Sequence, residues 1–321
     1  MATKRHYLLP AGVTRNVPAL RKLGWMLEAF IIKTLVAVIR AMPPERAMRL
    51  SYFVFRSLKP VLPFAKKIRR NLAVAFPQKD AREIERLTRS TCGNLGAAAA
   101  ELVLADRIWD EREERIEFVV ADGVDLADYR GRTAVMVTGH IGAWQIAAFI
   151  ATQFQLRITS VYAPEGNPYL GEFMQRLRSK LPCEFVSREG CMRTLVNELK
   201  NGHIAGLASD TRLDSGDRIP FFGMHTPANT TAARLAIRYN CDFFPVRAER
   251  LPGMKYRITL FEAIRPEDAA ASTSEQAKQM TRSLFEHFEA WIREAPDQWM
   301  CFGRRWPHEA YAEALKPVAH D

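Results

Sequence analysis

The chain has 321 residues, 48% of them hydrophobic, and a formal net charge of +10 at pH 7, which suits one large α/β domain with or without an N-terminal helical extension. The five cysteines form no CxxC pair and the seven histidines form no HExxH motif. This pattern argues against a disulfide framework, a zinc centre or another metal site, and indicates reduced thiols in a cytoplasmic setting.

The positive charge is concentrated at the N-terminus. Residues 1–70 contain fifteen Lys and Arg but only two acidic residues, Glu28 and Glu45, a balance of +13 that leaves −3 for the remainder. Such a segment is expected to dock on an anionic membrane surface, a nucleic acid or an acidic protein. A nucleic-acid partner is disfavoured because the basic residues alternate with long aliphatic ones and no recognised nucleic-acid motif is present.

Residues 23–42 form the most apolar stretch, but Glu28 and Lys33 interrupt it. A membrane span needs about 20 apolar residues with few or no charges. Lys22, Lys33 and Arg40 fall on one stripe of a helix, so the stretch is predicted to be an amphipathic helix lying in the membrane interface. A single tilted span and a helix packed on the domain remain open alternatives.

Further helices are predicted over residues 47–58 and 80–105. Between them a basic cluster of Lys66, Lys67, Arg69 and Arg70 suits anionic lipid headgroups, although a solvated charged face is also compatible with it. Residues 1–110 are therefore assigned to a basic, helical, membrane-associating region and residues 111–321 to an α/β domain, and the two are expected to form one continuous fold.

Strands and helices alternate through the rest of the chain. Strands are predicted near residues 116–120, 133–138, 157–163, 183–187, 203–209, 242–248 and 256–262. Helices are predicted near residues 141–154, 168–179, 190–200, 228–239 and 273–294. The predicted fold class is α/β, with a mostly parallel central sheet of about seven strands flanked by helices and an N-terminal helical segment.

A histidine follows one of the most apolar of these strands. The run from Ala134 to Val137 is typical of a strand covered on both faces, and His140 comes directly after it, between two glycines. Open α/β folds bind ligands at the carboxyl ends of their strands. His140 and Gln145 can meet only if the histidine lies in the loop and Gln145 in the first helical turn. An ordinary loop histidine remains the alternative.

Other polar residues follow neighbouring strands. Asp210 and Arg212 come after the strand at 203–209, so they are expected at the same sheet edge as His140. Arg188 follows the strand at 183–187 and could clamp a phosphate with both arms of its guanidinium, or form a charge pair at the start of a helix.

Two aromatic stretches have two interpretations each. Phe221 and Phe222, between Pro220 and Gly223, are either core residues or the wall of an acyl-chain groove. Arg304 and Arg305 lie among tryptophans near the C-terminus, which predicts stacking within the fold or a second anion site.

The order of these motifs resembles the lipid A biosynthesis acyltransferases of the HtrB/LpxL type, within the lysophospholipid acyltransferase superfamily. The similarity runs from Arg70-Asn71-Leu72-Ala73-Val74-Ala75-Phe76-Pro77 through Gly139-His140-Ile141-Gly142-Ala143-Trp144, Arg188-Glu189-Gly190, Asp210 and Pro220-Phe221-Phe222-Gly223 to Arg304-Arg305-Trp306. The resemblance implies a membrane-bound enzyme that moves a fatty acyl group from a thioester, acyl-carrier protein or acyl-CoA, to a hydroxyl of an anionic lipid. It implies no other cofactor and a place on the cytoplasmic face of the bacterial inner membrane, peripheral or with a single span.

The resemblance also implies roles for individual residues. His140 would act as general base, supported by an acidic residue at position 145, where this chain has Gln145. Asp210 is the first candidate to supply the missing carboxylate and Glu165 the second. Substrate-binding roles are implied for Gly142, Trp144, Arg188, Arg212, Phe221, Phe222, Gly223, Arg304 and Arg305.

Two other functions follow from what the sequence lacks. Because Gln145 carries no charge, a catalytically weak or inactive lipid-binding relative is the alternative to an active enzyme. A hydrolase is conceivable if water replaces the acceptor, but the absence of a GxSxG nucleophile elbow argues against the common serine mechanism.

Overall fold

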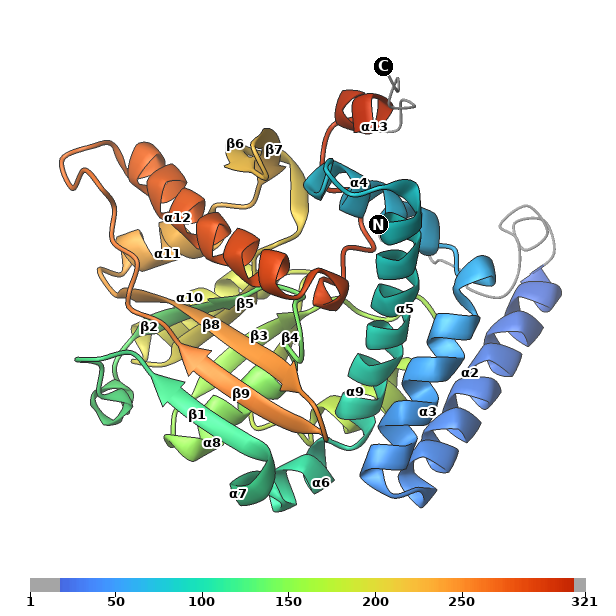
Figure 1. The fold of residues 1–321 in the computed structure, drawn as a ribbon. Coiled ribbons are helices and arrows are strands. Elements are labelled where there is room, and N and C mark those ends of the chain that lie inside the picture. The colour runs from blue at the N-terminus through green and yellow to red at the C-terminus, as the bar shows by residue number, and fades with distance from the viewer. Residues whose placement is uncertain (1–17, 315–321) are drawn as a thin grey trace.

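A seven-stranded sheet forms the centre of the computed structural model, which describes residues 18–314 (Figure 1). Its spatial order is β1 (Ile116–Val120), β9 (Lys255–Leu260), β8 (Asp242–Leu251), β2 (Ala134–Thr138), β5 (Ile204–Ala208), β3 (Ile158–Tyr162) and β4 (Glu184–Ser187). All neighbouring strands are parallel except β8 and β9. The predicted fold class and all seven predicted strands are therefore confirmed.

Successive side chains of the central strand β2 enter two different cores. Val135 and Val137 pack with the helices α10 (Cys191–Lys200), α11 (Thr231–Arg238) and α12 (Thr273–Glu294). Ala134 and Met136 pack on the other face with η3 (Ile146–Phe149), α8 (Ile150–Gln153) and α9 (Gly171–Arg178). Apolar residues on both faces explain why the sequence of this strand is continuously hydrophobic rather than alternating.

Three long helices lie side by side along one flank of the molecule (Figure 1). They are α2 (Pro18–Ala41), α3 (Pro44–Ser57) and α5 (Ala81–Val103), which confirms the predicted helices there. α5 begins with a capping box between Asp80 and Glu83. α3 and α5 approach closely, because a Cβ atom on Gly96 would lie only 2.3 Å from the backbone oxygen of Ser51.

The remaining elements are shorter. They are η1 (Lys59–Val61), α4 (Ala65–Ala75), α6 (Ala105–Asp110), α7 (Arg112–Arg115), η2 (Leu126–Tyr129), η4 (Pro296–Gln298) and α13 (His308–Ala314). Side chains of α4 and α5 belong to the same hydrophobic clusters as the sheet, while the boundary near residue 110 stays a prediction. Within residues 18–314, no helix combines the length and the apolar character that crossing a bilayer requires.

The predicted helix over residues 141–154 is wrong in its first half. The backbone N–H of Gly142 donates to Gln298 O at 2.9 Å, and that of Ala143 donates to Ala248 O at 2.8 Å. These bonds to distant segments replace helical ones, so the regular turns begin only at Ile146. The sequence also failed to predict a two-stranded hairpin, β6 (Arg212–Phe221) and β7 (Met224–Ala228).

Candidate active site

His140 lies just beyond the carboxyl end of β2 and forms a short hydrogen bond with Asp210. The distance from His140 Nδ1 to Asp210 Oδ1 is 2.7 Å. Asp210 follows the neighbouring strand β5, which is aligned with β2 by parallel pairing up to Thr138 and Ala208. The backbone extends this alignment, because Ser209 N donates to Thr138 O at 2.9 Å. Adjacent parallel strands thus deliver both side chains to one edge of the sheet, as the sequence predicted.

The loop that carries the histidine is fixed from the opposite side. Met300 N donates to His140 O at 2.8 Å, and Ile141 forms an isolated bridge with Trp299. The ring of His140 also lies beside Trp144 and Phe302, with centroid distances of 5.4 and 6.1 Å. These contacts hold the imidazole in one orientation while leaving 25% of its side chain exposed.

The two groups stabilise each other's charged forms. Burial alone would lower the pKa of His140, but the charge and hydrogen bond of Asp210 outweigh it, so the pKa of the imidazole is raised. Burial alone would raise the pKa of Asp210, yet the imidazole and, more weakly, the Arg305 cation lower it. Asp210, only 5% exposed, is therefore an ionised carboxylate that accepts a hydrogen bond from Nδ1–H and leaves Nε2 of the ring free to take a proton.

A cavity of about 250 Å³ adjoins this pair. Apolar groups from β2, β3, β5 and α8 dominate its lining, which comprises Leu102, Met136, Val137, Thr138, His140, Trp144, Gln145, Ala147, Ala148, Ile150, Ile158, Ser160, Val161, Tyr162, Ala163, Arg178, Leu181, Cys183, Phe185, Gly206, Leu207, Ala208 and Val246. Because the lining includes the first and last residues of β3, the cavity follows that strand for about 13 Å. A mostly apolar space with an imidazole in its lining suits an extended alkyl chain whose reactive end lies at His140.

Comparison with known proteins decides the family. Residues 15–308 match the family model described as bacterial lipid A biosynthesis acyltransferase. The chain belongs to this acyltransferase family. It is 25% identical over 266 residues to the lipid A biosynthesis palmitoleoyltransferase of Escherichia coli K12, which covers 78% of this chain and 83% of that protein. A lipid A biosynthesis acyltransferase of Shigella flexneri gives the same values, and one of Haemophilus influenzae is 20% identical over 193 residues, 59% of this chain and 58% of that one.

Position 145 is where this acyltransferase departs from the motif that the resemblance implies. Gln145 is the residue just before the turn η3 and lines the cavity, but it forms no hydrogen bond with His140 within the described residues. Its Oε1 atom is buried without a hydrogen-bond partner there. The other candidate, Glu165, forms an ion pair with Arg178. Of the three candidates for orienting the imidazole, Asp210 is therefore the one in contact with it.

The predicted substrate-binding residues around the histidine differ in placement. Trp144 lines the cavity. Gly142 is required by the backbone instead, since its φ is +63° and a Cβ atom there would lie 2.3 Å from Ala248 O. Gly223 likewise has a positive φ, +73°, in the turn between β6 and β7.

The prediction that Phe221 and Phe222 form the wall of the acyl groove is wrong. Neither residue lines the cavity beside His140. Phe221 is completely buried, and both side chains pack against Trp299 and Trp306 in the core on the other face of the sheet. The sequence could not distinguish the two roles, because large aromatic residues serve in cores and in ligand pockets alike.

The four predicted arginines lie in three environments. Arg188 is exposed after β4 and outside the cavity lining. Arg212 and Arg304 both reach Asp214, at 2.6 and 3.3 Å, on the hairpin side of the Asp210 segment. Arg305 is only 3% exposed, so it offers no surface to a substrate in this structure.

Some site residues had no signal in the sequence. Ser160, Tyr162 and Cys183 line the cavity from β3 and from the segment leading into β4, and Arg178 reaches it from α9, with its guanidinium 4.5 Å from the ring of Tyr162. Burial raises the pKa of Cys183 to about 12, so its thiol stays protonated and is no nucleophile. Over the described range, no three His, Cys, Asp or Glu side chains gather in a way that could hold a metal ion.

Proposed function

We propose that this acyltransferase moves a fatty acyl group from an acyl thioester to a hydroxyl of an anionic glycolipid, such as a lipid A precursor, with His140 as general base. The observation that carries the proposal is the His140–Asp210 pair, whose imidazole lines a mostly apolar cavity. The names of the bacterial relatives support the choice of acceptor.

The reaction needs one proton to move and one bond to exchange. Nε2 of His140 removes the proton of the acceptor hydroxyl while the oxygen attacks the thioester carbonyl. An ester C–O bond forms, the C–S bond breaks, and the leaving thiolate takes the proton from the imidazolium. Asp210 stabilises that imidazolium through the 2.7 Å hydrogen bond and fixes the tautomer that has Nε2 free.

Gln145 serves the substrate rather than the imidazole in this mechanism. Its amide lines the cavity, and its buried Oε1 lacks a partner within the described part of the chain. The donor in this role is the amide nitrogen of Gln145, not the unpaired Oε1, and it can donate a hydrogen bond to the thioester carbonyl, whose oxygen gains negative charge during attack. A carboxylate at this position would repel that oxygen while it is ionised.

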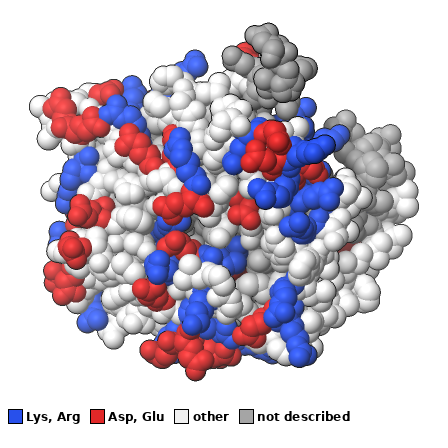
Figure 2. All heavy atoms as spheres, in the orientation of Figure 1, with Lys and Arg blue, Asp and Glu red and all other residues white. Residues whose placement is uncertain are grey.

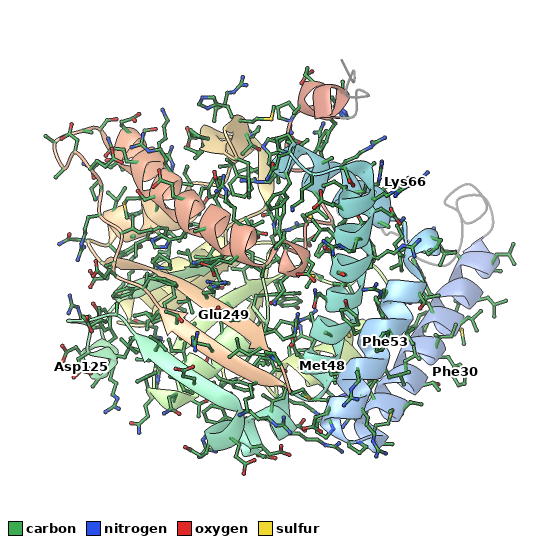
Figure 3. The ribbon with its side chains drawn as sticks, viewed as in Figure 1. Phe30, Met48, Phe53, Lys66, Asp125 and Glu249 are labelled. Carbon is green, nitrogen blue, oxygen red and sulfur yellow. The ribbon has the colours of Figure 1, made fainter. Side chains whose placement is uncertain are left out.

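The flank formed by α2 and α3 is proposed to rest on the membrane. Its exposed face carries Leu20, Leu23, Met26, Leu27, Phe30, Ile31, Leu35, Val38, Leu50, Phe53 and Val54. Phe30 and Phe53, marked in Figure 3, are 68% and 56% exposed. A continuous apolar face of this size indicates an interaction surface.

Two further observations fit a helix that lies on the membrane. Glu28, the acid that interrupts the apolar stretch, is turned inward and accepts a hydrogen bond from Asn167 at 2.8 Å. Basic residues of α4 lie beside the apolar face, with Lys66, Lys67 and Arg70 exposed, and Lys and Arg side chains gather in this region in Figure 2. Arg40, by contrast, is bound to Asp106 at 2.9 Å and does not serve lipid headgroups. These observations support a peripheral location, and the resemblance to the lipid A enzymes is the ground for proposing the cytoplasmic face of the bacterial inner membrane.

The test is acyl transfer by the purified protein. It is incubated with labelled acyl-carrier protein or acyl-CoA and, in parallel, with lipid A precursors and lysophospholipids in anionic vesicles. Transfer that disappears in His140→Ala, which keeps the melting temperature of the wild type, supports the proposal. Co-purified lipid without any turnover would instead favour the inactive lipid-binding relative, and thioester hydrolysis without an acceptor would favour a hydrolase.

A further inference from the structure

Arg305 is a buried cation whose side chain lies in the core beside Phe221 and Phe285. Its guanidinium carbon lies 4.8 Å from the ring centroids of both Phe221 and Phe285. The backbone holds the residue in place, since Arg305 N donates to the Tyr311 hydroxyl at 2.8 Å and Thr226 Oγ1 donates to Arg305 O at 2.5 Å. The side chain is thus fixed between two aromatic rings with 3% of its surface exposed.

The guanidinium has no hydrogen-bond partner among the described residues. Its Nε, Nη1 and Nη2 atoms are all buried and unsatisfied. Burial lowers the pKa of Arg305 to about 10, which still leaves it charged at neutral pH. A buried charge without a partner destabilises a fold, and an apolar side chain of similar length between two phenylalanines would avoid that cost. The cation–π contacts with Phe221 and Phe285, the stacking within the fold that the sequence predicted, offset part of this cost but leave all three guanidinium nitrogens without an acceptor.

The guanidinium of Arg305 interacts electrostatically with the carboxylate of Asp210. Asp210 is the group that most strongly favours the charged form of Arg305, and Arg305 in turn favours the ionised form of Asp210. The other groups that face this cluster are His140, Arg212, Tyr311 and Cys301, and burial keeps the Tyr311 hydroxyl and the Cys301 thiol neutral at neutral pH. Arg212 is the other permanent cation of the cluster, and its guanidinium is bonded to Asp214.

We propose that Arg305 is a positioning residue whose buried charge keeps the His140–Asp210 pair from binding an extra proton. This inference rests on the proposed role of His140 as a base. The carboxylate makes His140 a stronger base but also makes it easier to protonate in the resting enzyme. A second cation next to the carboxylate offsets this effect, so that the imidazole is free to accept the proton of the acceptor hydroxyl near neutral pH.

Removing the charge should move the titration of the pair in one direction. Without the cation, protonation of the pair becomes easier, so the acid limb of kcat/KM against pH moves to higher pH by about one unit. At a pH above the new limb, the variant regains the rate of the wild type. A residue needed only for packing would lower the rate equally at every pH.

The experiment compares three variants of the full chain. Arg305→Met removes the charge and retains the bulk of the side chain, whereas Arg305→Lys retains the charge. The control, Arg282→Met, removes an arginine of α12 from its exposed ion pair with Glu267. The measurements are the melting temperature, the pH profile of acyl transfer, and the NMR titration midpoint of the His140 ring, assigned by its absence in His140→Ala.

We expect Arg305→Met to melt at or a few degrees above the wild-type temperature and to raise both the acid limb and the His140 midpoint, while Arg305→Lys and Arg282→Met keep the wild-type values. A lower melting temperature or a failure to fold for Arg305→Met would mean that the charge serves the fold, and would overturn the proposal. So would an unchanged midpoint, or an equal shift in Arg282→Met. Because the NMR midpoint needs no turnover, a wild type without transferase activity refutes the proposed function separately.

Discussion

Asp210→Asn tests the central pair most directly. The substitution keeps the shape of the side chain but removes the charge that lies 2.7 Å from His140 Nδ1. An amide can also donate to Nδ1, which would place the ring proton on Nε2 and abolish its function as a base. The equivalent change in serine proteases, an established example, costs about 10⁴ in kcat. We expect a loss of 10³- to 10⁴-fold here, which corresponds to about 4–5.5 kcal/mol of transition-state stabilisation.

The assay is steady-state acyl transfer with purified variants at saturating acceptor. kcat should fall while KM for the acyl thioester changes less than threefold, because the carboxylate does not line the cavity. Asp128→Asn, a change at an exposed carboxylate, is the matched control and should keep the wild-type rate. Adding Gln145→Glu to Asp210→Asn should not restore the rate, since Gln145 is not bonded to the imidazole. A restoration to within tenfold of the wild type would refute the assignment of the pair.

The pair also predicts how stability depends on pH. The folded-state pKa of His140 is raised above its ordinary value of 6.5, so its contribution is fully present below pH 6.5 and decreases as the pH rises through the folded value. The pKa of Asp210 is lowered below 3.8, so its contribution is present above that pH and is lost on further acidification. The difference in melting temperature between the wild type and Asp210→Asn should therefore be larger at pH 5 than at pH 9.

Three further changes test the backbone, the cavity and the membrane face. Gly142→Ala places a Cβ atom 2.3 Å from Ala248 O at a positive φ, and should lower the free energy of unfolding by about 2 kcal/mol in denaturant titrations; an unchanged midpoint would contradict the close approach. Ala148→Phe fills the cavity and should lower kcat/KM for a long-chain thioester at least tenfold while sparing a short-chain one, whereas equal losses would mean that the acyl chain binds elsewhere. Phe30→Glu and Phe53→Glu should each weaken sedimentation with anionic vesicles about tenfold without changing the melting temperature, and unaltered binding would exclude this flank as the membrane contact.

The sheet could be predicted because its strands are short apolar runs separated by helical periods. The seven predicted strands overlap the observed ones, and the sequence placed His140 and Asp210 at the same edge of a parallel sheet. That their strands β2 and β5 are neighbours is known only from the structure. The helix over residues 141–154 failed because its first N–H groups bond to Gln298 and Ala248, segments more than 100 residues away. The spacing of apolar residues within a segment cannot predict hydrogen bonds to segments that are distant in the sequence.

The cavity could not be predicted from the sequence, because its lining comes from segments that are far apart in the chain. It is bounded by residues of β2, β3, β4, β5 and β8, by Leu102 of α5 and by Arg178 of α9, and these residues have no common motif. For Phe221 the sequence suggested a ligand-binding role that the structure does not support. The residue stands out between proline and a second aromatic residue, yet it is completely buried in the core. Burial of a single side chain depends on which elements pack over it, and that is decided only by the tertiary structure.

Gln145 illustrates how the same residue changes meaning once the fold is known. By resemblance, an acid belongs five residues after the histidine, and its replacement by an amide was the reason to consider an inactive relative. In the structure the carboxylate reaches the imidazole from the neighbouring strand β5 instead, and the segment between His140 and Gln145 is irregular and fixed to other parts of the fold. A carboxylate that follows a rigid parallel strand is oriented at least as firmly as one at the start of a short 3₁₀ turn. In the proposed mechanism the charge that supports the base therefore comes from Asp210, and an uncharged residue at position 145 is compatible with catalysis.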